Sequence, residues 1–564
     1  MADEDFIYNP DTAALVLQQE ALPKDFIKDH PGAIVSKPLT GDYVILYLNK
    51  SDINNVINGL ESYNSNPYPM AMGLLDEAEL EASGIVPVRE HAYLQLRGSG
   101  VLLGFVDTGI DYTNKAFIYE DGTSKIQYIW DQSIKGAPPE GYLYGSEYNR
   151  ELINHALASA NPRELVPHID TVGHGTFLAS VAGGRQLDNF TGAAPDAEII
   201  AVKLRKARPA EYERYLITPS VENVFSSDDF MLGIQYIVEK AKELGRPVAI
   251  CCALGTNQGG HDGLTTLERY LSRISGIIGV VTCVATGNEG QARHHAQGKI
   301  ELSGDSQTIE LRAGDRFEDV YITIWNNASD RLSVAVRSPS GEQVARVPAR
   351  SGIRVSNDLI LERSTVIVEY VFPIEGGGGQ LTRVKMLAAT PGVWVVTVYG
   401  DSVLDGAYHA WLPMTGFIDP DTVFLSPSPH CTITTPAVAL GTVTCGAYDS
   451  RNNSLYPPSS WGPSRLPSAV PDLTAPGVEV GGIYPASYGR MSGTSPAAAI
   501  TAGACALLLQ WGIVNNNDPS LNSYSARAYL IGGCEREANI VYPNDQWGYG
   551  RLNLMNTFMA LRTL

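Results

Sequence analysis

The sequence predicts an α/β fold: a mostly parallel sheet with helices on both faces, preceded by an α+β unit and interrupted by an antiparallel β sandwich. Three observations predict it. The 564 residues exceed what one hydrophobic core usually serves. Apolar runs alternate with helical segments between residues 101 and 295. From about residue 300 to 413, apolar residues alternate with polar ones instead.

The composition excludes several classes of protein. Hydrophobic residues make up 44% and charged residues 18% of the chain, as in ordinary globular proteins. A formal net charge of −20 repels phosphate backbones, so we expect no nucleic acid partner. The first residues are acidic, and no apolar run reaches about 18 residues. We therefore expect neither a classical signal peptide nor a membrane span.

The cysteines predict reduced, buried thiols rather than disulfides. There are seven, an odd number, and Cys251 and Cys252 are adjacent within an apolar run. The sequence has no CxxC or HExxH spacing that would predict a zinc site.

The first 95 residues predict a small α+β unit. Residues 43–48 are rich in β-branched and aromatic side chains, which is typical of a buried strand. Behind a serine that can cap a helix, apolar residues follow at helical spacing: Ser51, Ile53, Val56, Ile57 and Leu60. This helix would pack on the strand.

Four apolar runs predict strands of the parallel sheet: residues 101–106, 197–202, 248–250 and 279–284. Helical segments such as residues 229–243 lie between them. In such a sheet, catalytic groups are expected at the carboxyl ends of the strands.

The inserted sandwich is predicted by period-two alternation. Residues 320–325 and 393–398 are the clearest examples, and Pro, Gly, Asn and Asp turns separate such runs. We prefer a bracing role for this unit, with binding of a carbohydrate or another ligand as the alternative.

Two acid–base residues lie at element ends. Asp107 directly follows the first strand of the sheet, within Asp-Thr-Gly-Ile-Asp. His174 lies in Gly-His-Gly-Thr at the start of a small-residue helix, where glycines let other segments approach the imidazole. Taken alone, such an aspartate is more often a turn cap, and such a histidine more often bonds a backbone carbonyl.

Two further residues are suited to nucleophilic attack and charge stabilisation. Ser495 opens an apolar helix, with Pro496 in the first turn. The helix start supplies N–H groups and positive dipole character for an oxyanion. Asn288 ends another central strand, and its amide can donate to the same oxyanion. Taken alone, they are more often a helix cap and a turn residue.

The combination favours catalysis. A serine hydroxyl needs a histidine base, and that base needs a buried carboxylate to fix its tautomer. We therefore predict a triad of Asp107, His174 and Ser495. Asn288 and the Ser495 N–H would form the oxyanion hole.

The motifs Asp-Thr-Gly-Ile-Asp, Gly-His-Gly-Thr and Gly-Thr-Ser-Pro-Ala, in this order, resemble those of the subtilisin-like serine proteases, or subtilases. The resemblance covers about residues 100–295 and 415–564. Within the family, residues 253–263 and the inserted sandwich are most similar to the Csp germination proteases of anaerobic spore-forming bacteria.

The resemblance implies a subtilisin-like sheet in a four-part chain. Residues 1–95 would be a prodomain that assists folding and inhibits the enzyme. Residues 96–295 and 416–564 would form the subtilase domain, and residues 296–415 an inserted jelly roll. It also implies a serine endopeptidase acting on proteins or peptides, with its own prodomain bound in the active-site cleft.

The Csp resemblance implies an intracellular or spore-associated protein that activates the precursor of a cortex-degrading hydrolase by limited proteolysis. The alternative is a non-enzymatic signalling or scaffold protein, since some Csp relatives have degenerate triads. All three triad residues are retained here, which favours the enzyme.

The resemblance also implies how substrate is bound and where the chain cuts itself. Ala253, Leu254 and Gly255 would pair with an extended peptide as an added strand. The tail resembling that of the prodomain is residues 91–97, and we expect self-cleavage close to Gln95, with Tyr-Leu-Gln on the acyl side and Leu96 after the cut, and with an uncut linker as the alternative.

No cofactor and no metal site are predicted. Calcium stabilises many subtilases, yet no Asp-rich loop here has a recognisable ligand spacing, and a site built from backbone carbonyls would leave no such motif. His261 and Asp262 are expected to be structural, because the triad is complete without them.

Overall fold

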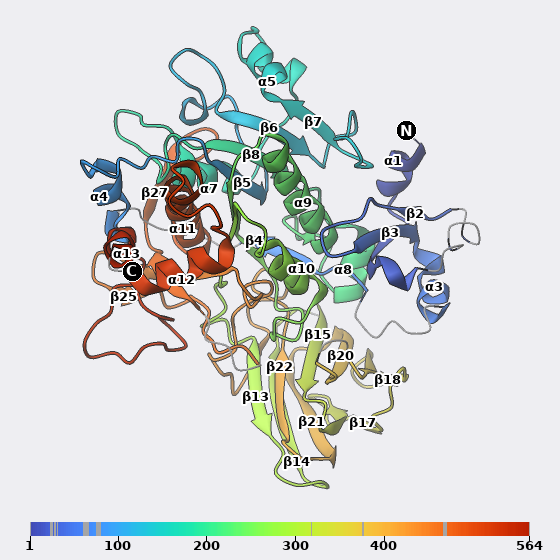
Figure 1. Ribbon diagram of the computed structural model, residues 1–564. Helices are drawn as coiled ribbons and strands as arrows, with labels where there is room; N and C mark the ends of the chain where they lie inside the picture. The colour runs from blue at the N-terminus through green and yellow to red at the C-terminus, as the bar shows by residue number, and fades with distance from the viewer. Residues whose placement is uncertain are drawn as a thin grey trace.

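The computed structural model describes residues 2–22, 26, 30, 32–59, 67–74, 81–316, 318–374, 377–465 and 471–562. Figure 1 shows a central sheet among helices, an N-terminal unit at one side, and a long antiparallel unit that projects away from both. The predicted α/β class and the inserted antiparallel unit are both present.

The central sheet has nine strands, and most of its neighbouring strands run parallel. Two strands, one near each end of the sheet, run antiparallel to their neighbours. In spatial order, eight strands are β25 (Ser454–Leu455), β24 (Val443–Asp449), β12 (Val280–Ala285), β10 (Val248–Cys252), β5 (Leu102–Asp107), β8 (Glu198–Lys203), β6 (Ile126–Asp131) and β7 (Ser146–Asn149); β26 (Leu473–Pro476) pairs with β24.

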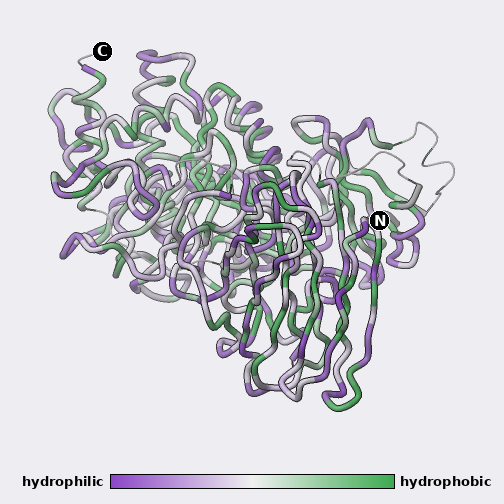
Figure 2. Tube along the Cα trace, turned by 90° about the horizontal axis from the view of Figure 1, so that it is seen from below, coloured by the Kyte–Doolittle hydropathy of each residue, from purple (hydrophilic) through white to green (hydrophobic). Residues whose placement is uncertain are grey.

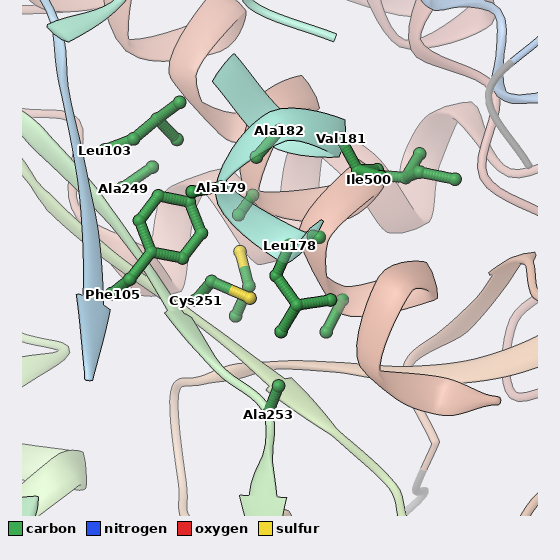
Figure 3. Close-up of a cluster of buried hydrophobic side chains, with 14 of the residues drawn as sticks. Leu103, Phe105, Leu178, Ala179, Val181, Ala182, Ala249, Cys251, Ala253 and Ile500 are labelled. Atoms are coloured by element: carbon green, nitrogen blue, oxygen red, sulfur yellow. The ribbon is translucent and has the colours of Figure 1, made fainter. Parts of the chain in front are cut away.

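Helices cover both faces of this sheet, because its inner strands are apolar on both sides. In β5, Leu103 and Phe105 face one core, whereas Leu102 and Val106 face the other. The first face is covered by α7 (His174–Gly183) and α11 (Thr494–Leu509), and the second by α9 (Ser227–Glu243) and α10 (Thr266–Ile274). Figure 3 shows the first core, where side chains of β5 and β10 meet those of α7.

The helix α11 is apolar all round and lies inside the protein. Together with the following π-helical turn, Gln510–Val514, it is the one helix among the described residues that is long and apolar enough to cross a membrane. Most of it is buried in the fold, and every residue of α11 is buried. Its composition is that of a core helix.

Shorter elements surround the sheet. They are α4 (Ile85–Glu90), α5 (Arg150–Leu157), α6 (Pro162–Leu165), α8 (Pro209–Tyr215), α12 (Ser523–Gly533), α13 (Leu554–Leu561) and the hairpin of β27 (Val480–Ile483) and β28 (Tyr488–Met491).

The N-terminal unit is a three-stranded antiparallel sheet with short helices. Its strands lie in the order β1 (Thr12–Gln18), β3 (Tyr43–Asn49) and β2 (Ile34–Val35), and its helices are α1 (Ala2–Ile7) and α3 (Ile53–Gly59). Ile53 and Val56 of α3 pack beneath the sheet, as the helical spacing predicts, while Leu60 lies outside the described residues.

A buried charge network joins this unit to the central domain. The Arg205 guanidinium pairs with Asp229 at 2.8 Å and donates to the Ile7 carbonyl at 3.0 Å. Arg208 lies over the Tyr47 ring. The paired charges belong to the central domain, and they contact the N-terminal unit through the Ile7 carbonyl and the Tyr47 ring.

The residues before the expected boundary at 95 do not all belong to this unit. Ile85, Val88 and Leu96 belong to the same core cluster as β5 and α11. By packing, the chain from α4 onward is part of the central domain.

The inserted unit is a sandwich of two antiparallel sheets around its own core. The six-stranded sheet has the order β13 (His295–Lys299), β22 (Ala407–Trp411), β15 (Glu318–Asn326), β20 (Gln380–Ala389), β19 (Ser364–Val371) and β18 (Arg354–Leu359). The five-stranded sheet has the order β17 (Gln343–Val347), β16 (Arg331–Arg337), β21 (Gly392–Ser402), β14 (Ser306–Ala313) and β23 (Val423–Phe424). Hydrophobic and hydrophilic stretches alternate along these strands in Figure 2.

The seven cysteines are all buried thiols, as the sequence predicts. Burial raises the pKa of Cys252 and Cys445 to about 12. They are therefore protonated packing groups at neutral pH.

Glu268 of α10 provides a pH test of the fold. Its carboxylate closes a capping box with Thr265 and is completely buried, and burial raises its pKa to about 7 from an ordinary 4.5. The folded state therefore prefers the protonated form, whereas the unfolded chain ionises above pH 4.5. The free energy of unfolding should fall as pH rises from about 4.5 to about 7, by up to about 3 kcal/mol.

We predict that Glu268→Gln removes this loss. Chemical unfolding across pH 4–8, in a Ser495→Ala background to prevent self-digestion, should show the variant gaining stability relative to its parent as pH rises. Parallel pH profiles for the two proteins would contradict the assignment.

Candidate active site

Asp107 is the last residue of β5, at the carboxyl edge of the sheet. It is buried, and the Thr108 backbone N–H donates to Oδ1 at 2.7 Å. β5 pairs in parallel with β10, with Phe105 opposite Cys251. The carboxyl ends of these two strands are therefore neighbours, about 4.8 Å apart.

His174 is the first residue of α7, and its imidazole faces Asp107. Nδ1 lies 2.8 Å from Oδ1 and 2.9 Å from Oδ2 of that carboxylate. Both side chains are buried. Because Nδ1 must donate to the carboxylate, Nε2 is the basic nitrogen of the neutral ring.

The close approach of α7 to the Asp107 turn requires a glycine. A Cβ at Gly175 would lie 2.2 Å from the Gly109 carbonyl oxygen. The start of α7 is further held by Asp170, whose carboxylate accepts the N–H groups of Gly173 and Thr176 at 2.8 and 2.9 Å. Asp170 was not singled out from the sequence, because it lies three residues before the N-cap position, Gly173, and no capping pattern marks it.

Ser495 lies in the first turn of α11, and its Oγ is 3.4 Å from the Ala253 carbonyl oxygen. Ala253 directly follows β10. The predicted nucleophile therefore lies at the end of the strand next to β5, which carries Asp107. The helix N-terminus directs positive dipole character toward an oxyanion formed here.

Asn288 follows β12 and faces the same helix start. The Thr494 backbone N–H and hydroxyl lie 3.2 and 3.3 Å from Oδ1 of Asn288. A backbone N–H can only donate, so the amide oxygen must face Thr494, and Nδ2 points away from this contact within the same amide plane. Nδ2 is therefore the group with which Asn288 would bind an oxyanion.

The substrate-binding strand holds a different segment from the one that the sequence predicts. Leu254 and Gly255 form β11, which pairs antiparallel with β4 (Ala71–Leu74), Leu254 opposite Leu74 and Gly255 opposite Gly73. The other edge of β4 pairs with β9 (Phe225–Ser226). The segment paired with the predicted substrate-binding residues is thus residues 71–74 and not the predicted tail around Gln95.

Gln95 and Leu96 lie far from the cleft, so the predicted cleavage position is corrected. Leu96 is buried in the central core, and the N–H groups of Arg97 and Gly98 both donate to Gln510 Oε1, at 2.9 and 2.7 Å. Gln510 follows the C-terminal end of α11, about 22 Å along the helix from Ser495 at 1.5 Å per residue. The prediction rested on the resemblance of this tail to that of a prodomain, and the resemblance gave no sign that the tail packs at the far end of α11.

A second His–Asp pair supports the catalytic turn. His168 Nδ1 lies 2.6 Å from Asp131, and its Nε2 accepts the Ile110 N–H at 3.1 Å. Burial alone would raise the pKa of Asp131, but the hydrogen bond from His168 brings it below the ordinary value. The pair was missed because Asp131 and His168 lie in no shared motif.

Glu289, directly after Asn288, fastens the sandwich to the site. Its carboxylate accepts the Asn257 amide at 2.9 Å and the Thr415 N–H at 3.0 Å, and it pairs with His294 Nδ1 at 2.7 Å. His294 directly precedes β13, the first strand of the sandwich, and Thr415 lies between its last two strands, β22 and β23. The start of the insertion and the segment between β22 and β23 therefore meet one residue from the predicted oxyanion donor.

His261 is a structural residue, as expected. Its two ring nitrogens lie 2.7 and 3.1 Å from the carbonyls of Ile433 and Asn257, and the ring stacks on Trp411. Asp262 pairs with Arg465. Within the described ranges, no group of three or more His, Cys, Asp or Glu side chains could hold a metal ion.

Comparison with known proteins agrees with this geometry. The model of the subtilase family matches residues 98–316 and 425–550. The structure of the Clostridium perfringens CspB protease superposes with a TM-score of 0.76 and 31% identity, over 86% of this chain and 98% of that one.

Two Arabidopsis thaliana relatives match over shorter stretches. Subtilisin-like protease SBT3.3 is 25% identical over 246 residues, which is 41% of this chain and 30% of that protein. Subtilisin-like protease SBT3.5 is 29% identical over 129 residues, which is 19% of this chain and 16% of that protein. These matches span less than a third of each plant protein, whereas the family model spans both halves of the split sheet domain, with Asp107, His174, Asn288 and Ser495 inside the matched ranges. The chain belongs to the subtilase family of serine peptidases.

Proposed function

We propose that the chain is a serine endopeptidase that hydrolyses peptide bonds through Ser495. The observation that carries the proposal is that His174 Nδ1 lies within hydrogen-bond distance of both carboxylate oxygens of Asp107, beside the start of the Ser495 helix. His174 Nε2 takes the proton of Ser495 Oγ as the oxygen attacks the substrate carbonyl, and Asp107 stabilises the resulting imidazolium. The same proton then passes to the leaving amine.

The negative oxygen of the tetrahedral intermediate would be bound by Asn288 Nδ2 and the Ser495 N–H. Thr494 holds the Asn288 amide in the required orientation before substrate arrives. A donor fixed in advance costs no reorganisation during the reaction. The non-enzymatic alternative has no comparable observation in its favour.

We predict that Asn288→Ala lowers kcat by roughly 10²- to 10³-fold and changes KM little, because the lost donor acts on the transition state. Steady-state cleavage of a fluorogenic peptide measures both constants, and the unfolding temperature serves as the control for fold. A kcat within about threefold of wild type, in a variant of unchanged unfolding temperature, would rule out this role for Asn288.

We propose further that the chain cleaves itself between Leu75 and Asp76. The support is the register of β4: Gly73 is opposite Gly255 and Leu74 is opposite Leu254, so β4 runs toward Ala253, the residue whose carbonyl contacts Ser495. Residues 75 and 76 themselves lie outside the described part of the chain. On this proposal the N-terminal segment is a prodomain that occupies the cleft as its first substrate.

N-terminal sequencing and intact mass of the purified protein test this position. We predict a new N-terminus at Asp76, absent in Ser495→Ala. Leu75→Asp should slow processing at least about tenfold, because the cleft would have to desolvate a carboxylate. The matched change Gln95→Asp, at an exposed residue, should leave the rate unchanged. A new N-terminus at Leu96, or full-length wild type, would overturn the proposal.

As for the physiological substrate, we propose the precursor of a spore cortex hydrolase, cut once during germination in an intracellular or spore compartment. The support is the similarity to the CspB protease together with the Csp-like residues 253–263. Incubating the processed chain with such a purified precursor should release one new N-terminus, and Ser495→Ala should release none. A precursor left intact by the wild type would exclude this substrate.

A further inference from the structure

The peptide in the cleft is held well beyond the four residues of β4. The Ala71 N–H donates to Gln258 Oε1 at 3.2 Å. One residue earlier, the Met70 N–H donates to Ser227 Oγ at 2.7 Å, and the Met70 carbonyl accepts the Ser227 N–H at 2.8 Å. One residue earlier again, the Tyr215 hydroxyl donates to the Pro69 carbonyl at 2.9 Å. These four hydrogen bonds bind three consecutive residues, Pro69, Met70 and Ala71. Ala71 is the first residue of the β4–β9 pairing, and the other two precede it.

All the groups that make these bonds come from the central domain. Gln258 lies three residues after β11, Ser227 opens α9, and Tyr215 ends α8. Their partners on the peptide are main-chain atoms, which any polypeptide offers. At Pro69 only the carbonyl is used, so a proline fits there without losing a bond.

A side-chain pocket accompanies this main-chain binding. The Met70 side chain is buried in a cluster with Phe225, Met231, Leu254 and Leu267. A cavity of about 70 Å³ beside it is lined by aromatic rings of the sandwich, Tyr321 and Trp325, and at its other walls by polar side chains that include Asp262 and Arg383. Figure 1 places β4 near the middle of the molecule, close to the base of the sandwich. The pocket therefore selects an apolar side chain at this position.

We propose that Tyr215, Ser227 and Gln258 form a binding site for an extended polypeptide five to seven residues before the scissile bond, with an apolar side chain at the sixth. The segment of residues 69–71 stands in for that substrate in the present structure. The inference rests on the proposed peptidase function and deepens it: the substrate is a protein with an extended linker rather than a short peptide.

Peptides of two lengths test the site on the self-processed full chain. One fluorogenic substrate carries residues 69–75, Pro-Met-Ala-Met-Gly-Leu-Leu, and the other only residues 72–75, Met-Gly-Leu-Leu. The measured quantity is the ratio of their kcat/KM values. Any prodomain left in the cleft competes equally with both peptides, so it cancels from this ratio.

We expect the kcat/KM of the longer peptide to exceed that of the shorter one roughly 10- to 100-fold. The difference should lie mainly in KM, because the four hydrogen bonds form equally in the bound substrate and in the transition state. Tyr215→Phe, which removes one hydroxyl, should lower the ratio about 2- to 10-fold. Tyr212→Phe is the matched control: its hydroxyl, on the same helix, donates to the Val221 carbonyl away from the peptide, and the ratio should not change.

Each outcome decides a separate point. Equal kcat/KM values for the two peptides in the wild type, or a ratio that Tyr215→Phe leaves unchanged, would overturn the extended site while leaving the peptidase function standing. Cleavage of neither peptide by a chain whose Ser495 reacts with a fluorophosphonate would overturn the extended site alone, whereas cleavage of neither by a chain whose Ser495 does not react would refute the peptidase function, and the extended site with it.

Discussion

The contact between Asp107 and His174 is the interaction on which the site depends, because it joins the end of a buried strand to the start of a buried helix. The carboxylate fixes the imidazole through Nδ1, and this leaves Nε2 for the serine. The start of the helix can approach the Asp107 turn this closely only because residue 175 is a glycine. The Cβ of any other residue there would clash with the Gly109 carbonyl oxygen. The parallel sheet then places the end of β10, with Ala253 and Ser495, beside that of β5.

The second constraint is the position of Asn288 relative to the nucleophile. Thr494, the neighbour of Ser495, orients the amide, so the predicted nucleophile and the predicted oxyanion donor are positioned by one helix start. Glu289, the next residue after Asn288, is bonded both to the segment before β13 and to the segment between β22 and β23. The insertion is thus bonded to the segment that carries the oxyanion donor, and this geometry is consistent with the bracing role expected of it.

Local chemistry made much of this predictable from the sequence. Each predicted site residue occurs in a short motif, and the neighbouring residues in the sequence show the glycines, the strand or the helix start beside it: Asp107, His174, Asn288 and Ser495. The alternation of apolar and polar residues indicated the sandwich. The occupant of the cleft could not be predicted in this way. β4 is only four residues long, its pairing with β9 and β11 joins segments more than 150 residues apart, and no local pattern distinguishes it from a loop. The tail at Gln95 was chosen by likeness, whereas the burial of Leu96 and the bonds from Arg97 and Gly98 to Gln510 depend on the folded helix α11.

The central claim is that Ser495 is a nucleophile activated by His174. Labelling with a fluorophosphonate, followed by mass mapping of the modified peptide, tests it most directly. The account predicts a stoichiometric adduct on Ser495 in the processed wild type and at least roughly 10³-fold slower labelling in His174→Ala. An adduct on another residue, no adduct, or equal labelling rates in the two proteins would contradict it.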